Sequence, residues 1–372
     1  MSRQSELAEL SRIYDSSALS NRNLIINGAM NVAQRDTQVT SVTSNGYKTL
    51  DRMRFSENSL GTAAFTHEQV TDAPDGFANS FKLTCTTAEG SVGAADACRA
   101  IEYRIEGQDV QQLQYGTSSA KKLTLSFYVK SSLTGTYTIA LYRNETQTRV
   151  ITATYTINSA NTWEYKTITF DGDTSSVITN DNARRLQIYW VVGSGSDYTS
   201  TDSTSWIDYV SGGFHYGQTA QFQNTLNATW QITGVQLEVG DTATPFEHRS
   251  YGDELQKCQR YFQKYNYSSS LSDADAQNTL PLVAAYSGGV GYAGHKLTQT
   301  MRTSPTFSAS AANTWVFYAN GSSYTPSEMT AYETGPSMWG QKYTATTNFT
   351  AGNAVYGRAN STSSYYQFDA EL

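Results

Sequence analysis

A series of short alternating segments between residues 123 and 239 constrains the fold of this chain most strongly. The segment LTLSFYVKS at residues 123–131 has apolar residues at alternate positions from Leu123 to Val129. A similar alternation follows in GTYTIALYR, RVITATYTI, RRLQIYWVVGSGS and TWQITGVQLEVG, and less cleanly in WEYKTITFDGD. Because successive side chains of a β-strand point to opposite faces, each segment predicts a strand with one buried face. Short strands separated by turns indicate a β-sandwich or a jelly roll.

The composition agrees with an all-β protein of more than one domain. The 372 residues include 26 Tyr and 27 Gly but only 6 Pro, and 16% of the residues are charged. β-branched and aromatic residues favour strands, whereas Gly and Asn favour turns. The chain is too long for one ordinary small domain, so two or three domains are expected.

Charge and hydropathy exclude several classes of partner. The net charge is −7 and the chain has no run of Lys or Arg, which predicts that it does not bind nucleic acid. No apolar stretch approaches 18 residues, which predicts no membrane insertion. The N-terminus, MSRQSELAELSRIYDSS, lacks the apolar segment of a secretory signal, so synthesis in a cytoplasm is expected.

The three cysteines, Cys85, Cys98 and Cys258, match neither a zinc site nor a disulfide framework. They form no CxxC pair and no Cys/His ligand spacing. We expect three small buried apolar side chains. A Cys85–Cys98 bridge is the less favoured alternative, because a cytoplasm keeps thiols reduced.

Two segments have a helical period. Near the N-terminus, Leu7, Leu10 and Tyr14 form a narrow apolar stripe at i, i+3 and i+7. A helix this short is marginal alone, so it needs the body of the protein, copies of itself or another protein as a partner. The segment SYGDELQKCQRYFQKY has apolar residues at i, i+3, i+7 and i+10 and predicts a helix over residues 251–265.

These patterns divide the chain into four parts. Residues 1–20 are a short helix and a linker, and residues 21–250 are a β-sandwich of the jelly-roll kind. Residues 251–265 are a linking helix. Residues 266–372 return to a composition rich in Ser, Thr, Gly and Tyr, and predict a second, small β-sandwich ending in the strand SYYQFDAEL.

No motif for catalysis is present, and the chain is predicted not to be an enzyme. The four His residues show no metal-ligand spacing, and neither a GxSxG elbow, a P-loop nor a fixed-period repeat occurs. A pair of carboxylates for glycoside hydrolysis needs only to converge in space, so a glycan-cleaving enzyme stays as an alternative.

No cofactor is predicted, although two segments cluster oxygen atoms of the kind that Ca²⁺ accepts. They are DGD at residues 171–173 and SDADAQN at residues 272–278. Neither is a complete Ca²⁺ loop, and Asp and Gly are ordinary turn residues. The turn interpretation is favoured, with a structural Ca²⁺ as the alternative.

Aromatic residues among turn residues are the candidates for sugar binding, because ring faces stack on sugars while Asn, Gln and Asp bind hydroxyls. Aromatics in loops are better candidates than aromatics in strands. The alternative for Trp315, Phe317 and Trp339 is the core of a small sandwich. The candidates for glycan or receptor binding are Trp315, Tyr318, Tyr324, Tyr332 and Trp339, with Tyr198 as a weaker one.

An ordered set of motifs resembles bacteriophage virion proteins, chiefly tail fibres and other structural proteins. The motifs are NRNLIINGAMNVAQRD, LDRMRF, LTLSFYVKSSLTGTYTIALY, WEYKTITFDGD and ITGVQLEVGDTATPFEHRSYGDELQKCQRYF. They cover about residues 21–265, and the chain end FDAEL is also similar. The central domain of such proteins is similar to a carbohydrate-binding-module jelly roll.

The resemblance implies how the chain is arranged and used. NLIINGAM would be the first core strand, and GVQLEVGDTATPFEHR the last strand with its exit loop, close to the first. The N-terminal part would attach to other virion proteins or self-associate through Leu7, Leu10 and Tyr14. Residues 266–372 would contact a host glycan or another receptor, in a homotrimer on the virion exterior. A tail fibre that adheres to the host is the favoured function. A head fibre, a capsid decoration protein or a tail adaptor without receptor binding is the alternative, which the resemblance does not separate from it.

Overall fold

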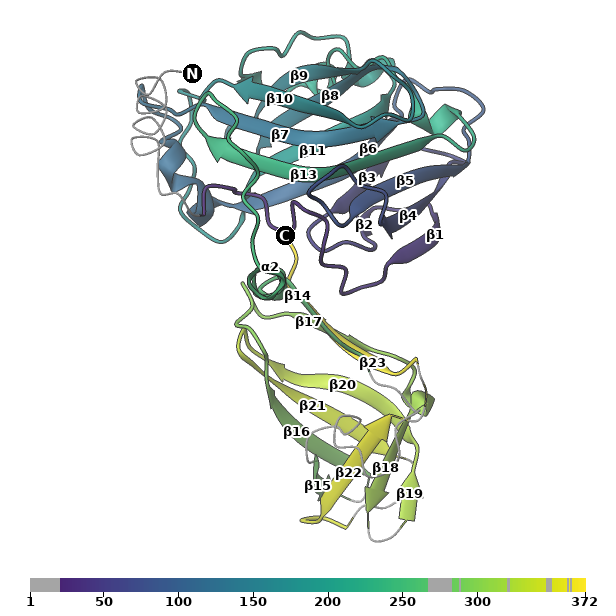
Figure 1. Cartoon of the computed structure of the whole chain (residues 1–372). Helices are drawn as coiled ribbons and strands as arrows, with labels where there is room; N and C mark the ends of the chain where they lie inside the picture. The colour runs from purple at the N-terminus through teal and green to yellow at the C-terminus, as the bar shows by residue number, and fades with distance from the viewer. Residues whose placement is uncertain are drawn as a thin grey trace. The chain divides into compact units, whose positions relative to one another are not determined.

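The computed structural model divides the chain into two compact units (Figure 1). Unit 1 ends at Glu254 and includes Leu372, and unit 2 comprises Leu255–Glu371. The predicted N-terminal helix, with Leu7, Leu10 and Tyr14, lies outside the described residues. The structure describes residues 21–266, 283–287, 289–319, 322–345, 350–359, 361 and 363–372.

Unit 1 contains two antiparallel sheets. The first has the strand order β1-β4-β5-β13-β7-β10 and the second has the order β12-β9-β8-β11-β6-β3-β2. The strands are β1 (Gln38–Val42), β2 (Gly46–Tyr47), β3 (Arg54–Asn58), β4 (Ala64–Val70), β5 (Ser80–Thr87), β6 (Ala97–Glu106), β7 (Leu123–Ser131), β8 (Gly135–Arg143), β9 (Arg149–Ile157), β10 (Glu164–Phe170), β11 (Arg184–Ser194), β12 (Ile207–Asp208) and β13 (Thr229–Val239). Short 3-10 helices are η1 (Gly107–Leu113), η2 (Ser196–Tyr198), η3 (Ser211–Gly213) and η4 (Phe222–Asn224).

The core of unit 1 lies between these two sheets. Phe127 of β7 and Trp190 of β11 come from different sheets, and their ring centroids are 6.2 Å apart. Phe55 of β3 and Phe65 of β4 meet in the same way at 5.3 Å. Unit 1 is therefore a β-sandwich, and the expectation of an all-β chain is confirmed. The six alternating segments of the sequence form β7, β8, β9, β10, β11 and β13.

The segment NLIINGAM is not a strand, contrary to the prediction. Residues 26–29 form a turn, and the backbone of Asn27 is left-handed, with φ of 63°. The Asn27 side chain fixes this turn because its amide donates to the carbonyl oxygens of Val32 (2.8 Å) and Asp51 (3.0 Å). Asn tolerates the left-handed region better than other non-glycine residues, so the local polar bonds outweigh the apolar pattern.

The expected proximity of this segment to the last strand of unit 1 is confirmed. The amide of Leu24 donates to the carbonyl of Leu237 at 2.9 Å, and Val235 donates to Gly28 at 2.9 Å. Val235 and Leu237 both belong to β13. Unit 1 therefore closes on its own ends.

A set of charged and amide side chains, here called the N-terminal staple, holds this closure. Asn23 donates its backbone N–H to Glu247 (2.9 Å), and Asn27 donates to Glu254 (2.6 Å). Arg249 donates to the carbonyl oxygens of Asn23 (2.6 Å) and Ile25 (3.1 Å). The staple comprises Asn23, Asn27, Glu247, Arg249 and Glu254.

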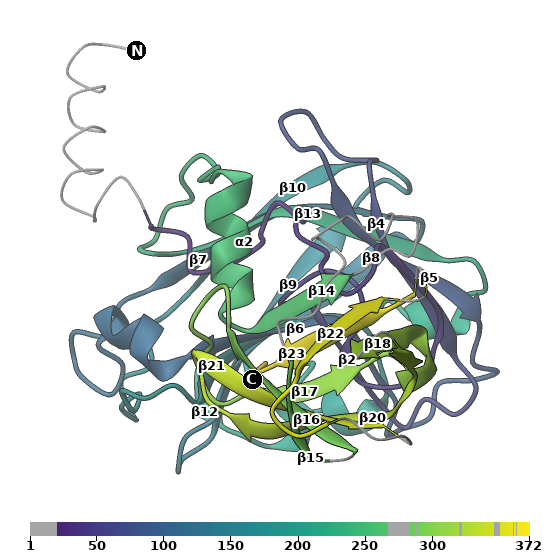
Figure 2. The ribbon, with the colours of Figure 1, turned by 90° about the horizontal axis from the view of Figure 1, so that it is seen from below.

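The helix predicted over residues 251–265 is shorter in the structure. Helix α2 covers Tyr251–Gln259, and Phe262–Asn266 forms strand β14 (Figure 2). All five residues of β14 pair in register with β23 (Tyr365–Asp369). Pairing with a strand about a hundred residues away overrides the local helical period. A short apolar pattern does not by itself distinguish a helix from a strand.

Unit 2 is built from two further antiparallel sheets. They have the strand orders β14-β23-β17 and β19-β18-β22-β15-β16-β21-β20. A shared core that includes Trp315, Trp339 and Phe368 lies between them. The remaining elements are β15 (Val283–Ser287), β16 (Val290–Lys296), β17 (Thr306–Ala309), η6 (Ala312–Thr314), β18 (Trp315–Ala319), β19 (Ser322–Tyr324), β20 (Pro326–Thr334), β21 (Met338–Ala345) and β22 (Ala354–Ala359).

Two further findings complete the fold. In the part of the chain that the structure describes, no helix is long and apolar enough to cross a membrane. Cys85, Cys98 and Cys258 are buried and none of them is in a disulfide, so the Cys85–Cys98 bridge does not form. Burial raises the pKa of the Cys85 thiol to about 11, with a smaller contribution from Glu89.

Candidate functional site

Two of the predicted sugar-binding residues, Trp315 and Trp339, belong to the core of unit 2 instead. Their side chains are 0% and 3% exposed. The Trp339 ring stacks on Phe307 with centroids 4.9 Å apart, and the Trp315 indole donates to Ser310 Oγ at 3.1 Å. Both lie in strands, where alternation turns them inward, so the core alternative is confirmed for them and for Phe317. A buried ring face cannot stack on a sugar.

Tyr318 and Tyr324 are only partly exposed. The Tyr318 hydroxyl accepts a hydrogen bond from Arg358 at 2.8 Å, and the guanidinium lies 5.2 Å from the Tyr318 ring centroid. Tyr324 packs against the core of unit 2. Their rings are therefore engaged within unit 2.

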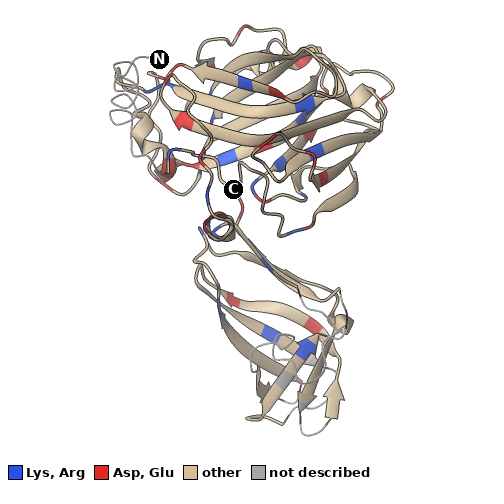
Figure 3. Ribbon diagram, in the orientation of Figure 1, with Lys and Arg blue, Asp and Glu red and all other residues tan. Residues whose placement is uncertain are grey.

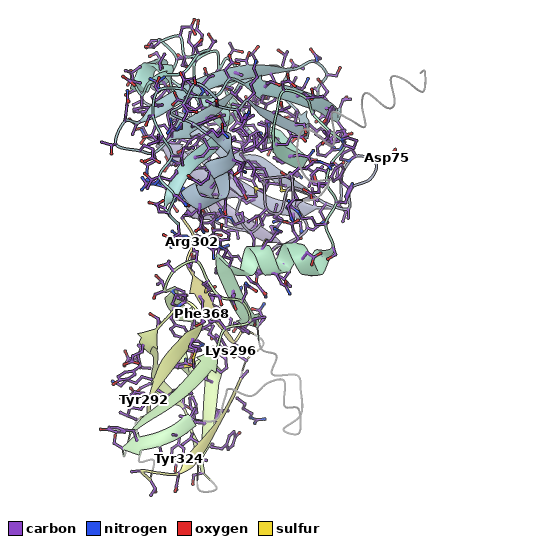
Figure 4. The ribbon with its side chains drawn as sticks, turned by 90° about the vertical axis from the view of Figure 1, so that its left-hand side faces the viewer. Asp75, Tyr292, Lys296, Arg302, Tyr324 and Phe368 are labelled. Carbon is purple, nitrogen blue, oxygen red and sulfur yellow. The ribbon has the colours of Figure 1, made fainter. Side chains whose placement is uncertain are left out.

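Tyr332 is an open aromatic side chain, and the structure adds two more beside it. Tyr332 is 60% exposed and Tyr286 is 72% exposed, while Tyr292 lies between them. The ring centroids of Tyr286 and Tyr292 are 5.6 Å apart, and those of Tyr292 and Tyr332 are 4.7 Å apart. We call these three residues the tyrosine face. In Figure 4, Tyr292 projects away from the sheet.

Strand alternation places the tyrosine face on the outer side of the large sheet of unit 2. In β15, Val283 and Ala285 are buried while Ala284 and Tyr286 are exposed. Ala284 pairs with Tyr292 of β16, so Tyr292 faces outward with them. Tyr286 and Tyr292 were not among the predicted binding residues. The alternation in VAAYS and VGYAGHK is the signal that could have identified both.

The chemistry of the tyrosine face suits a partner with both apolar and polar surface. Tyrosine combines a large apolar ring with a hydroxyl that donates and accepts hydrogen bonds. The C–H faces of a sugar ring can stack on the aromatic rings, and its hydroxyls can bond the phenols. Residues of both charge signs lie on the large sheet of unit 2, so its surface does not carry a single sign of charge (Figure 3).

The other predicted aromatic residue, Tyr198 of unit 1, is held in a packed loop. It is partly buried, its ring centroid lies 5.1 Å from that of His215, and its hydroxyl accepts from the Asn58 amide at 2.9 Å. These contacts order the loops around η2 and η3. Tyr198 therefore offers less free ring surface than the tyrosine face.

A buried Ser–His pair lies near Tyr198, and its hydrogen bonds decide whether the His can activate the Ser as a nucleophile. Ser194 Oγ lies 2.8 Å from His215 Nδ1, and Arg99 Nε donates to His215 Nε2 at 2.9 Å. Because Nε2 must accept the arginine N–H, a neutral His215 carries its proton on Nδ1 and cannot take the serine proton there. Burial, then Arg99, also holds the pKa of His215 well below its usual value. The pair is therefore a structural link and does not activate a nucleophile.

Unit 1 has a second group of surface aromatic residues, which were not predicted from the sequence. Tyr165 is 49% exposed, and its ring centroid lies 4.9 Å from that of Tyr128. Nearby, Lys130 Nζ lies 5.2 Å from the Trp163 ring centroid, and the indole N–H of Trp163 points to Asp72 at 3.3 Å. The Trp163 ring is thus partly covered, which makes this group a poorer stacking surface than the tyrosine face.

The segment at residues 171–173 is organised by ion pairs and not by a metal-type cluster. Asp173 is buried, and its carboxylate accepts hydrogen bonds from Arg143 and from Arg149 (3.2 Å). Asp171 pairs with Lys122 at 2.9 Å. Among the described residues, no group of three or more His, Cys, Asp or Glu could hold a metal ion. The other Ca²⁺ candidate, residues 272–278, lies outside the described residues.

Comparison with known proteins gives matches only among solved structures. No family model and no curated protein matches the sequence. The enzymatically active domain of tailspike protein 4 from bacteriophage CBA120 is 12% identical over 59% of this chain, with a TM-score of 0.30. The match spans 21% of that chain, about a fifth of its length.

Two further similar structures are carbohydrate-binding modules of Xyn10C from Paenibacillus barcinonensis. The xylan-binding CBM22-1 domain is 9% identical and covers 61% of this chain and 100% of its own, with a TM-score of 0.29. The tandem CBM22-1–CBM22-2 domain is 9% identical and covers 95% of this chain and 98% of its own, with a TM-score of 0.29. TM-scores this low do not establish a shared fold, so the fold is assigned from the strand pairing of this chain.

Proposed function

We propose that this chain is a non-enzymatic bacteriophage virion protein, a tail fibre that adheres to the host surface through unit 2. The observation that carries the proposal is the exposed tyrosine face on the outer side of a sheet. The motifs over residues 21–265, which resemble phage structural proteins, support the virion assignment. In this proposal unit 1 is a jelly roll of the carbohydrate-binding-module type and serves as the body.

Adhesion through such a surface requires several copies. A single shallow aromatic face binds a sugar weakly, because few groups are desolvated on contact. In a homotrimer, linked copies raise the effective concentration of the second and third sites, and the avidity gain can reach about 10²–10⁴. Residues 1–20, with Leu7, Leu10 and Tyr14, would supply attachment to other virion proteins or self-association.

The experiment compares variants of the full chain on the phage that carries it. Tyr286→Ala with Tyr332→Ala removes two exposed rings of the tyrosine face, and we expect adsorption to host cells to fall severalfold or more with particle yield unchanged. Tyr165→Ala, which removes an exposed ring of unit 1, is the matched control and should adsorb normally. Normal adsorption of the double variant would refute adhesion through this face.

The place of attachment needs a separate measurement. Cryo-electron microscopy of intact particles should locate the chain on the tail, in three copies per fibre, with unit 2 outermost. Density on the capsid would instead identify the chain as a head fibre or a decoration protein. Density at an adaptor position, with unit 2 covered by other proteins, would identify it as an adaptor protein. Release of reducing ends from host polysaccharide by the purified chain would instead indicate a depolymerase.

A further inference from the structure

Two glycines form a gap in the middle of the surface that carries the tyrosine face. Gly294 of β16 and Gly340 of β21 are directly opposite each other in the sheet. Tyr292 and Gly294 are two residues apart on one strand, so both face outward. The outward surface therefore has no side chain at the position next to Tyr292.

The backbone does not explain these glycines. Neither Gly294 nor Gly340 has a φ in the left-handed region that favours glycine. A Cβ added to Gly294 would meet no described atom within 4 Å, and one added to Gly340 would come no closer than 3.6 Å, to the backbone N of Glu333. Glycine weakens a strand interior and commonly marks a place where a ligand or another backbone approaches closely.

The gap has defined walls. On one side Tyr292 pairs with Lys342, and on the other Lys296 pairs with Met338, whose side chain is 61% exposed. From Tyr292 to Lys296 the strand rises about 13 Å, at ~3.3 Å per residue. This length accommodates one sugar ring with its hydroxyl groups, lying on the peptide backbone.

We propose that the glycine gap, here called the glycine seat (Gly294 and Gly340), holds one pyranose ring of a neutral glycan. The ring lies on the backbone and against Tyr292, while neighbouring sugars contact the other tyrosines. This assignment rests on the proposed adhesion through the tyrosine face and specifies which sugar class that face takes.

The charges around the glycine seat favour a neutral sugar. Lys296 and Lys342 face outward beside the seat, and Glu333 and Glu328 face outward from β20, opposite Gly340 and Thr344. Two cations and two carboxylates balance locally, and each can bond a sugar hydroxyl. The net charge of −7 for the whole chain disfavours a polyanionic glycan.

The test fills the seat without removing any contacting group. Gly294→Thr places a β-branched residue in the strand, and Gly90→Thr is the matched control at an exposed glycine of unit 1 with no atom within 4 Å. The probe is an array of neutral and acidic bacterial surface polysaccharides, read with the full chain. We expect wild type and Gly90→Thr to bind neutral glycans, and Gly294→Thr to bind them at least about tenfold more weakly.

Thermal unfolding and further variants keep the outcomes separate. The Tm of Gly294→Thr should not fall, because threonine favours strands; if it does fall, Gly340→Ser provides the same steric test. Loss of binding in Tyr292→Ala but not in Gly294→Thr would overturn the glycine seat and leave adhesion standing. Unchanged binding in both would refute adhesion through the tyrosine face itself.

Two more results would also overturn the assignment. Binding restricted to acidic glycans, or binding to no glycan of the array, would exclude a neutral sugar on the seat. A change of oligomeric state in Gly294→Thr, measured by analytical ultracentrifugation, with glycan binding retained, would identify the seat as a contact between copies of the chain.

Discussion

His67 should make the stability of unit 1 depend on pH in a range where carboxylates do not contribute. The side chain is 2% exposed and lies in the core, with its ring centroid 4.9 Å from Phe55 and 5.5 Å from Phe81. Burial, and to a smaller extent the charge of Lys48, lowers the pKa of His67 to about 3. The folded state therefore keeps this imidazole neutral throughout mildly acidic pH.

The sign and size follow from proton linkage. Below the ordinary histidine pKa of about 6.5, His67 is protonated in the unfolded state but stays neutral in the folded state. Acid therefore stabilises the unfolded state. Between pH 7.5 and pH 5.0 this costs about 2 kcal/mol for one such histidine. His215, whose pKa is also held well below its usual value by burial and by Arg99, should add a loss of the same sign.

The assay is urea unfolding of the full chain at several pH values, followed by tryptophan fluorescence. Trp163, Trp190, Trp206 and Trp230 report on unit 1, leaving two tryptophans in unit 2. Between pH 7.5 and pH 5.0, the free energy of unfolding of His67→Met should fall by about 2 kcal/mol less than that of wild type, whatever its value at pH 7.5. His248→Gln, at an exposed position, is the control and should follow wild type. A parallel pH profile for His67→Met would refute a neutral buried His67.

Two other substitutions test the closure of unit 1 and the core of unit 2. Arg249→Ala removes hydrogen bonds to two buried carbonyls and should lower the free energy of unfolding by about 1–3 kcal/mol, with faster hydrogen exchange at residues 23–27; Arg249→Lys should restore only part, since an ammonium lacks the planar fork. Trp339→Ala should cost unit 2 about 3–5 kcal/mol, whereas Tyr332→Ala should stay within about 0.5 kcal/mol of wild type in urea unfolding. Equal losses for these two variants would contradict the separation of core and surface.

The strands of unit 1 were predictable from sequence where one face is buried and the other is polar. The six predicted segments alternate in this way along their sequences, and they lie where expected. Strand β6 was not predicted; both of its faces are buried, and Arg99, Glu102 and Glu106 lie on it. Ion pairs allow these charged side chains to be buried. Glu102, for example, pairs with Arg104 two residues away and with Arg54 of β3.

The errors have a common physical cause, which is that long-range pairing decides between local alternatives. Residues 262–266 fit a helical period but pair with β23, which lies about a hundred residues later. Trp315 and Trp339 lie among Gly, Asn and Ser, which suggested loops, yet both occupy strands that turn them inward. The tyrosine face was only partly predicted, because its three rings meet through a sheet whose register the sequence does not specify.

Several residues of the N-terminal staple lie within the motifs that resemble phage structural proteins. The motif NLIINGAM supplies Asn23 and Asn27, LDRMRF supplies Asp51, and PFEHRSYGDE supplies Arg249. The Asn27 side chain donates to the carbonyl of Asp51, and Arg249 donates to the carbonyl of Asn23. Their chemistry is the closure of unit 1, and none of them belongs to the tyrosine face. The resemblance therefore supports the proposed body, and the proposed specificity depends on the side chains of unit 2 alone.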